Sequence, residues 1–147
     1  MRVAFASDDE NETTRAVLKA LTDDGYEVIR PDGSPGWPDL GRFVGRAVVD
    51  GRADYGVVMC WTGTGTAIAA NKVPGVRAAL AWDPWIARGA RLWNDANVLA
   101  MSLKRLAPDV AVEVLRAFLD TPEPDPEEAA NIALIELPDD VLDDRIG

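Results

Sequence analysis

The segment from Cys60 to Thr66, CWTGTGT, holds the residues best suited to chemistry. A buried strand is predicted to end at Cys60, and a helix is predicted to begin after Gly63 and Gly65. The amino terminus of a helix offers unpaired N–H groups and a positive dipole, so this turn could hold an anion. The same position would favour the thiolate of Cys60 as a base or nucleophile. The spacing alone is equally compatible with a structural turn and an inert buried cysteine.

Other candidate side chains are expected to follow neighbouring strands. Asp8 comes directly after an apolar run at residues 2–7, where it could bind ligand hydroxyls or cap the next helix. Asn94 lies between a predicted helix and strand, where it could point an amide at a neighbouring strand end or only form a turn. Tryptophans could line one pocket, pack inside the protein or form a subunit interface. All of them fall in one part of the chain: Trp37, Trp61, Trp82, Trp85 and Trp93.

Alternating apolar patterns predict the elements that position these residues. Apolar runs predict strands at residues 2–7, 26–30, 55–60, 76–81 and 97–101. Helical spacing predicts helices within residues 9–25, 39–50, 66–72, 84–93 and 108–119, and a short one in AANIALIEL near the end. This order predicts an α/β fold with a doubly wound, mainly parallel five-stranded sheet, Rossmann-like, with helices on both faces. Ligands of such sheets bind beyond the carboxyl ends of the strands.

Length and charge indicate one domain with a distinct tail. The chain has 147 residues, 48% of them hydrophobic and 27% charged, which is typical of a globular protein. We expect residues 1–121 to form the α/β domain and residues 122–147 an acidic carboxyl-terminal extension. Residues 121–147 hold nine acidic side chains against Arg145 alone. The near-neutral body offers no basic stripe, so nucleic acid is not an expected partner.

Composition also limits the kinds of catalytic site that the chain can form and the cellular compartment in which it is expected. Histidine is absent, which excludes zinc triads and Ser-His-Asp triads within one chain. The single cysteine can form no internal disulfide and fits a reducing compartment. The amino-terminal residues are neither apolar enough nor long enough for a signal peptide or a membrane span. We therefore expect a cytoplasmic protein that does not associate with membranes.

Three stretches resemble the ribose-5-phosphate isomerase B and galactose-6-phosphate isomerase family. They are SDD at residues 7–9, C-x-TGTG with IAANKVPGVRAAL at residues 60–80, and NDANVLA at residues 94–100. The unbroken IAANKVPGVRAAL is far more specific than the glycines. Members interconvert aldose and ketose sugar phosphates through an enediolate, in a homodimer whose active sites combine both subunits. The resemblance implies an isomerase without metal or cofactor, a homodimer or tetramer, and a carboxyl-terminal helix that reaches the partner.

The resemblance also implies roles for the central residues. Cys60 matches the base that moves a proton between two adjacent sugar carbons, and Thr62 matches a threonine that assists ring opening. The side chain of Asn94 matches one that stabilises the enediolate oxygen, together with backbone amides. Those amides belong to the loop Gly63, Thr64 and Gly65.

Substrate-binding positions differ from the family in several places. Asp8 matches an aspartate that binds sugar hydroxyls, but Asp9 and Trp93 stand where the family usually has histidine. The second of those histidines usually serves ring opening. Trp61 replaces a small residue after the cysteine. Trp61 and Trp93 would narrow the pocket and supply stacking faces for a sugar or another ring.

The phosphate-binding segment differs most. The family pattern GGRHQ and a following arginine bind phosphate across the dimer, whereas this chain has PDPEEAAN at residues 124–131. Lys104 stands near another family arginine and is the one basic phosphate candidate, with Arg105 beside it. A phosphate would be repelled where charge-assisted hydrogen bonds are expected. The residues that replace the family's cations are Glu127, Glu128 and Asn131.

The sequence therefore predicts an aldose–ketose isomerase or epimerase with Cys60 as its base. Because the phosphate-binding residues are missing, we expect an altered substrate, such as an unphosphorylated sugar or a sugar-like intermediate. Two alternatives stay open. One is a genuine ribose-5-phosphate isomerase B, in which backbone amides, Lys104, or arginines of the dimer such as Arg88 and Arg91 replace the missing cations. The other is a catalytically inactive ligand-binding or regulatory homologue.

Overall fold

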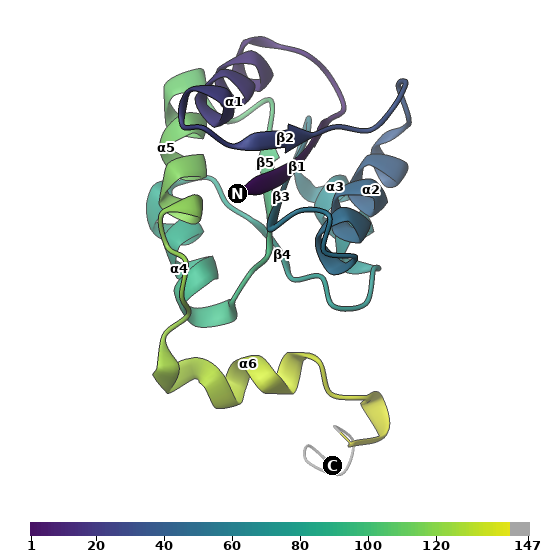
Figure 1. Ribbon diagram of the computed structural model, residues 1–147, viewed down its shortest axis with the longest axis vertical. Coiled ribbons are helices and arrows are strands. Elements are labelled where there is room, and N and C mark those ends of the chain that lie inside the picture. Colours follow the sequence, from purple (N-terminus) through teal and green to yellow (C-terminus); the bar gives the residue numbers. More distant parts are fainter. Residues whose placement is uncertain (142–147) are drawn as a thin grey trace.

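The computed structural model describes residues 1–141 and contains one parallel sheet flanked by helices (Figure 1). The strands lie in the order β2-β1-β3-β5-β4, and every pairing between them is parallel. They are β1 (Arg2–Ser7), β2 (Glu27–Ile29), β3 (Tyr55–Cys60), β4 (Ala78–Leu80) and β5 (Val98–Ser102). This arrangement confirms the expected five-stranded, doubly wound α/β fold.

Each strand leads into a helix. The helices are α1 (Glu12–Asp23), α2 (Trp37–Val49), α3 (Thr64–Asn71), α4 (Pro84–Asn94), α5 (Pro108–Leu119), the 3₁₀ turn η1 (Pro126–Glu128) and α6 (Ala129–Ile135). The side chain of Asn11 accepts a hydrogen bond from the Thr14 amide at 3.0 Å and caps α1. Capping by Asp8, one of the two sequence interpretations of that residue, is therefore wrong. None of the helices in the described range is long and apolar enough to cross a membrane.

Two layers of helices cover the sheet. Helices α1, α4 and α5 pack on one face, while α2 and α3 pack together on the other (Figure 1). The residues of β5 are all buried, and so are those of β3 except Tyr55. Coverage on both faces explains why these central strands are apolar without polar alternation.

The direction of winding reverses between β1 and β3. From β1 the chain first moves outward to β2, and then returns to place β3 on the other side of β1. Such a reversal opens a crevice beyond the carboxyl ends of the two strands. The amide of Asp8 donates to the carbonyl of Met59 at 2.9 Å, which ties the residues after β1 to the end of β3. Asp8 and Cys60 therefore lie at the reversal.

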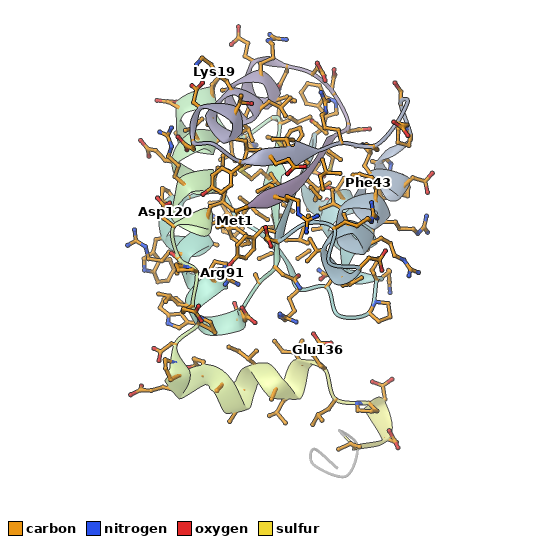
Figure 2. All side chains as sticks on the ribbon, in the orientation of Figure 1. Met1, Lys19, Phe43, Arg91, Asp120 and Glu136 are labelled. Carbon is orange, nitrogen blue, oxygen red and sulfur yellow. The ribbon has the colours of Figure 1, made fainter. Side chains whose placement is uncertain are left out.

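The carboxyl-terminal segment lies along the opposite edge of the sheet, where the strands begin. The guanidinium of Arg91 donates to the carbonyls of Thr121 at 3.0 Å and Pro122 at 2.6 Å. Arg77 forms an ion pair with Glu136 at 2.8 Å, and Figure 2 shows Glu136 between α6 and the body. The predicted acidic extension is thus described as far as residue 141, and its last residues, 142–147, lie outside the described range.

Candidate active site

Residues from three elements surround a pocket at the carboxyl edge of the sheet. The pocket has a volume of about 320 Å³. Asp8 follows β1, Trp37 begins α2, and the remaining lining comes from the turn between β3 and α3. The lining residues of that turn are Cys60, Trp61, Thr62, Thr64 and Gly65. Most of the site residues expected from the sequence therefore meet in one place.

Cys60 lines this pocket and is held by hydrogen bonds. Its side chain is buried, and the hydroxyl of Thr66 donates to Cys60 Sγ at 3.3 Å. Burial raises the pKa of the thiol, but the side chain and backbone of Thr66, the backbone of Gly63 and the hydroxyl of Thr62 lower it. The pKa of Cys60 is lowered overall from its ordinary value. The thiolate, which is the form able to accept a proton, is therefore favoured.

Some backbone amides of the turn after Cys60 already donate hydrogen bonds within the turn. Gly63 has a φ of +78°, and its amide donates to the Cys60 carbonyl at 3.2 Å. The Thr64 amide donates to the Thr62 hydroxyl at 3.3 Å. Within residues 1–141, the amide of Gly65 has no such partner. Of the three loop amides implied by the resemblance, that of Gly65 is the one left for a substrate oxygen.

Two residues of the site were not singled out from the sequence. Thr66 was placed only in a helix, although a threonine in the first turn after a strand end can reach back to that end. Trp37 was counted among the tryptophans without a role. A Cβ at Gly65 would lie 3.0 Å from the Trp37 ring, so the ring rests directly on the loop and walls the pocket. A side chain at position 65 would push this ring away by a few tenths of an ångström.

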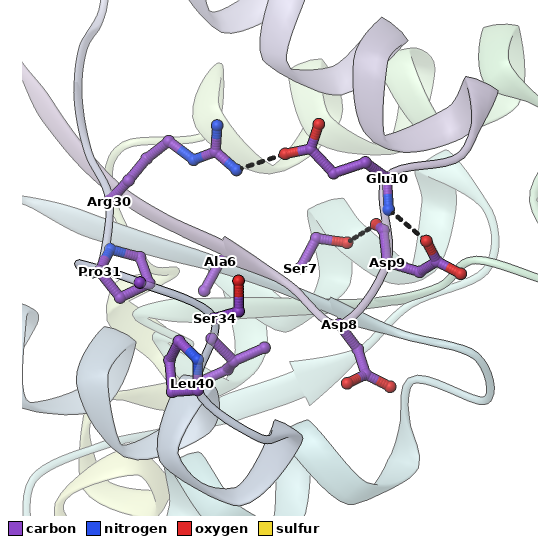
Figure 3. A pocket seen from close by; sticks show the side chains of 11 residues that line it. Ala6, Ser7, Asp8, Asp9, Glu10, Arg30, Pro31, Ser34 and Leu40 are labelled. Carbon is purple, nitrogen blue, oxygen red and sulfur yellow. Dashed lines mark hydrogen bonds and ion pairs between the residues drawn. The ribbon is translucent and has the colours of Figure 1, made fainter.

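A second cavity adjoins the first at Asp8, which lines both. It has a volume of about 260 Å³, and Figure 3 shows that the carboxylates of Asp8 and Asp9 point in different directions. Asp9 accepts a hydrogen bond from the Glu10 amide at 2.7 Å, and Glu10 forms an ion pair with Arg30 at 2.7 Å. Asp9 thus lies beside the Cys60 pocket rather than in it. No described group of cysteine, aspartate and glutamate side chains is arranged to hold a metal ion.

Lys104 lies close to the Cys60 turn. Its amide donates to the carbonyl of Trp61 at 3.2 Å, and the amide of Leu103 donates to the carbonyl of Cys60 at 2.9 Å. The segment after β5 is therefore joined directly to the turn after β3. The Lys104 side chain is exposed and does not line the Cys60 pocket itself.

Asn94 and Trp93 lie away from Cys60 in the same chain. Helix α4 starts after β4, at the carboxyl edge, and runs back so that Asn94 ends it just before β5 begins. The ring of Trp93 meets that of Trp85 edge to face, with 5.5 Å between the centroids. The carboxyl-terminal segment reaches the same region, because the amide of Asp125 donates to the Leu92 carbonyl at 2.8 Å. The five tryptophans therefore do not line one pocket within a chain.

Arg91 is not available to a phosphate. Its side chain is 3% exposed, and its guanidinium donates to the Asp95 carboxylate and the Ala96 carbonyl, both at 2.7 Å, besides the two carbonyls of the carboxyl-terminal segment. The idea that Arg91 supplies a missing cation is therefore wrong. Its donors already stabilise the fold.

Known proteins share both the sequence pattern and the fold of this chain. A family model described as Ribose/Galactose Isomerase matches residues 3–135. The chain is 39% identical over 127 residues to YwlF of Bacillus subtilis, provisionally named a sugar phosphate isomerase (82% of this chain, 85% of that protein). It is 37% identical over 102 residues to a D-erythrulose-4-phosphate isomerase of Pectobacterium atrosepticum (69% and 67%). The structure of ribose-5-phosphate isomerase B from Clostridium thermocellum matches with a TM-score of 0.83 and 35% identity, over 92% of this chain and 95% of that one.

Proposed function

The chain belongs to the ribose/galactose isomerase family, and on that premise we propose that it interconverts an aldose and a ketose with Cys60 as the base. The observation that carries this proposal is the hydrogen bond from Thr66 to Cys60 Sγ at the wall of an open pocket. It favours a thiolate at a point that a small substrate can reach. A buried cysteine with only packing neighbours would have neither the donor nor the cavity.

The proposed reaction is a proton transfer between adjacent carbons. The thiolate of Cys60 takes a proton from the carbon next to the carbonyl, which gives an enediolate and a thiol. The thiol returns the proton to the former carbonyl carbon, while the hydroxyl proton moves between the two oxygens, so the product is an isomer. The Gly65 amide, at the positive end of α3, stabilises the charged oxygen. Thr62 assists ring opening, and Asp8 accepts hydrogen bonds from sugar hydroxyls.

The site is completed by a second subunit in this proposal. Cys60 lies at the carboxyl edge of the sheet, whereas Asn94 and Trp93 lie at the amino edge. In a twofold dimer, the carboxyl edge of each subunit would face the amino edge of the other. Each of the two identical sites then combines the carboxyl edge of one subunit with the amino edge of its partner. Every tryptophan is between 40% and 68% exposed in the single chain, which supports burial of such surface in a dimer. Residues 1–121 form the catalytic domain, and the acidic extension lies at the edge that meets the partner.

The proposed substrate differs from ribose 5-phosphate. Trp37 and Trp61 narrow the pocket. Glu127 and Glu128 belong to the carboxyl-terminal segment, which in the proposed dimer would face this pocket from the partner subunit. A short sugar fits such a pocket better than a long one, and one of the relatives is named for an erythrulose phosphate. We place the enzyme in the cytoplasm, where its cysteine stays reduced.

The experiment is a sugar panel assayed with the wild-type chain and Cys60→Ala. The panel holds D-erythrulose 4-phosphate, ribose 5-phosphate and galactose 6-phosphate, each with its unphosphorylated counterpart. We expect one member to turn over with uptake of solvent deuterium at carbon, and Cys60→Ala to lower kcat by about 10²- to 10⁴-fold. Equal activity in the two proteins would refute Cys60 as the base.

The other outcomes of the panel decide between the alternatives. Ribose 5-phosphate as the best substrate would make the chain an ordinary ribose-5-phosphate isomerase B. The replacement of both family histidines, by Asp9 and Trp93, favours a ligand-binding homologue as the second candidate. Thermal stabilisation by a sugar, without turnover of any member, would identify that function.

A further inference from the structure

Within residues 1–141, Asp95 is the one residue other than glycine that has a positive φ. It follows the last residue of α4 with a φ of +47° and a ψ of +43°, in the left-handed region. Glycine is the usual residue at such a helix end, because a Cβ there crowds the neighbouring carbonyl oxygen. A strained residue persists where its surroundings hold it, and such residues gather at functional sites. The contacts that hold Asp95 therefore bear on the site.

Every polar group of Asp95 has a partner. Its amide donates to the Arg91 carbonyl at 3.1 Å, and its carbonyl accepts a hydrogen bond from Nε of Arg77 at 2.8 Å. Its carboxylate accepts from Nη1 of Arg91 at 2.7 Å and, through the other oxygen, from Nη2 of Arg77 at 3.1 Å. A glycine would adopt the same backbone at no steric cost but could not bind the two guanidinium groups. The ion pairs, rather than the turn, therefore explain why aspartate is present.

The two arginines join Asp95 to the rest of the amino edge. The side chain of Arg91 is buried and also donates to two carbonyls of the carboxyl-terminal segment. Arg77 comes just before β4, is largely buried, and also pairs with Glu136 near the end of α6. The carboxylate of Asp95 lies between these two cations and offsets the repulsion between them. The end of α4 is therefore fixed relative to both β4 and the carboxyl-terminal segment.

Asn94, the residue before Asp95, has no such contacts of its own. Its side chain is exposed and forms no hydrogen bond within residues 1–141. In the proposed dimer, this amide reaches the Cys60 pocket of the other subunit and stabilises the enediolate oxygen. A donor of this kind must lie within a fraction of an ångström of its productive position. That position depends on the backbone of Asn94, and the adjoining peptide is held by Asp95.

We propose that Asp95 is a positioning residue, which fixes the backbone of Asn94 so that its amide meets the enediolate oxygen in the pocket of the other subunit. This role rests on the isomerase function and the shared site proposed above. Asp95 touches no substrate and acts through Asn94. The amide is needed when negative charge develops on the oxygen, so its displacement should lower kcat and leave KM nearly unchanged.

The first test compares kcat and KM of the wild type, Asp95→Asn and Asp24→Asn with the sugar that turns over in the panel. Asparagine keeps the size of the side chain and tolerates the left-handed conformation, so Asp95→Asn chiefly removes the negative charge. Asp24 is a matched control: its carboxylate also accepts two hydrogen bonds from a guanidinium, that of Arg116, at 2.9 and 3.0 Å, but it follows α1. We expect Asp95→Asn to lower kcat by about ten- to a hundred-fold at nearly constant KM, and Asp24→Asn to leave both unchanged.

The second test repeats Asp95→Asn in the Asn94→Ala background. With no amide left to position, Asp95→Asn should lower kcat no further. A purely structural role would lower kcat by the same factor in both backgrounds. That result, a wild-type kcat in Asp95→Asn, or a loss confined to KM would each overturn the proposal.

Arg77→Gln is the second variant, should Asp95→Asn fail to fold. It removes the hydrogen bond to the Asp95 carbonyl but keeps the carboxylate that neutralises the buried Arg91. It should lower kcat in the same direction by a smaller factor, and again not in the Asn94→Ala background. An equal loss in both backgrounds would contradict the proposal.

Amide hydrogen exchange tests the same contacts without turnover. In Asp95→Asn, the amides of residues 94–96 should exchange at least about tenfold faster than in the wild type, whereas Asp24→Asn should leave them unchanged. Unchanged exchange in Asp95→Asn would overturn the proposal. If no sugar turns over but exchange at these residues still rises, the isomerase function fails while Asp95 is shown to hold Asn94 in place.

Discussion

Thr66 is the residue whose side chain most directly controls the proposed base. Its hydroxyl donates to Cys60 Sγ and contributes to the lowered pKa of that thiol. Thr66→Val removes the donor and keeps the shape, so the pKa of Cys60 should rise. The acid limb of the kcat/KM profile should then move to higher pH. At pH values below this limb, kcat/KM should be roughly tenfold lower than in the wild type, because a hydrogen bond to a charged group is lost. At pH values above it, kcat/KM should change little.

The measurement has a readout that does not depend on turnover. The thiolate absorbs in the ultraviolet, so titration of its absorbance follows Cys60 directly. Thr66→Ser keeps the hydroxyl and should restore both the titration curve and the activity profile. A Thr66→Val protein that titrates like the wild type would show that Thr66 only packs beside the sulfur.

At the scale of elements, the close packing of α2 against α3 keeps the residues of the site in position. A Cβ at Gly41 of α2 would lie 2.7 Å from Ala69 Cβ and 2.7 Å from the carbonyl oxygen of Thr66 in α3. Gly41→Ala should therefore push the two helices apart. We expect a free energy of unfolding lower by about 1–3 kcal/mol and a Tm lower by several degrees. Because Thr66 moves with α3, kcat/KM should fall as well.

Gly36 provides the control for this substitution. An added Cβ there meets only Pro38, at an ordinary 3.7 Å, so Gly36→Ala should change the free energy of unfolding by less than about 1 kcal/mol. Denaturant unfolding followed by tryptophan fluorescence compares the two variants. Equal stability of Gly41→Ala and the wild type would mean that α2 and α3 can separate without cost.

For the whole molecule, the proposed dimer predicts complementation between inactive subunits. Cys60→Ala damages the carboxyl edge, and Asn94→Ala damages the amino edge. In a mixed dimer one site receives both intact halves, while the other receives both damaged ones. When equal amounts of the two variants are unfolded and refolded together, about a quarter of the wild-type activity should return.

The control mixture joins two variants of the same edge. Cys60→Ala mixed with Cys60→Ser should recover nothing, because every site then lacks the thiol that acts as the base. Light scattering of the wild-type chain should report at least a dimer. If neither mixture recovers activity, or if light scattering reports a monomer, the site is not shared between subunits and Asn94 takes no part in the reaction.

Local sequence patterns determined the elements of this protein. The strands predicted at residues 2–7 and 55–60 match β1 and β3, and the helix at residues 108–119 matches α5. Apolar spacing depends on which faces of a segment are buried, and that information is local. The strands predicted at residues 26–30 and 76–81 are shorter in the structure, because β2 and β4 lie at the edges of the sheet and pair on one side only.

The tertiary structure alone decided which residues meet. The sequence placed Cys60 and Asp8 at strand ends, but only the order β2-β1-β3-β5-β4 makes those two ends neighbours. The contact between Thr66 and Cys60, and the wall formed by Trp37, depend on the packing of α2 against α3. Asn94 lies at the opposite edge because α4 runs back against the strands. Local apolar spacing specifies a buried face but not the neighbour that covers it, and neighbours are set when the layers pack.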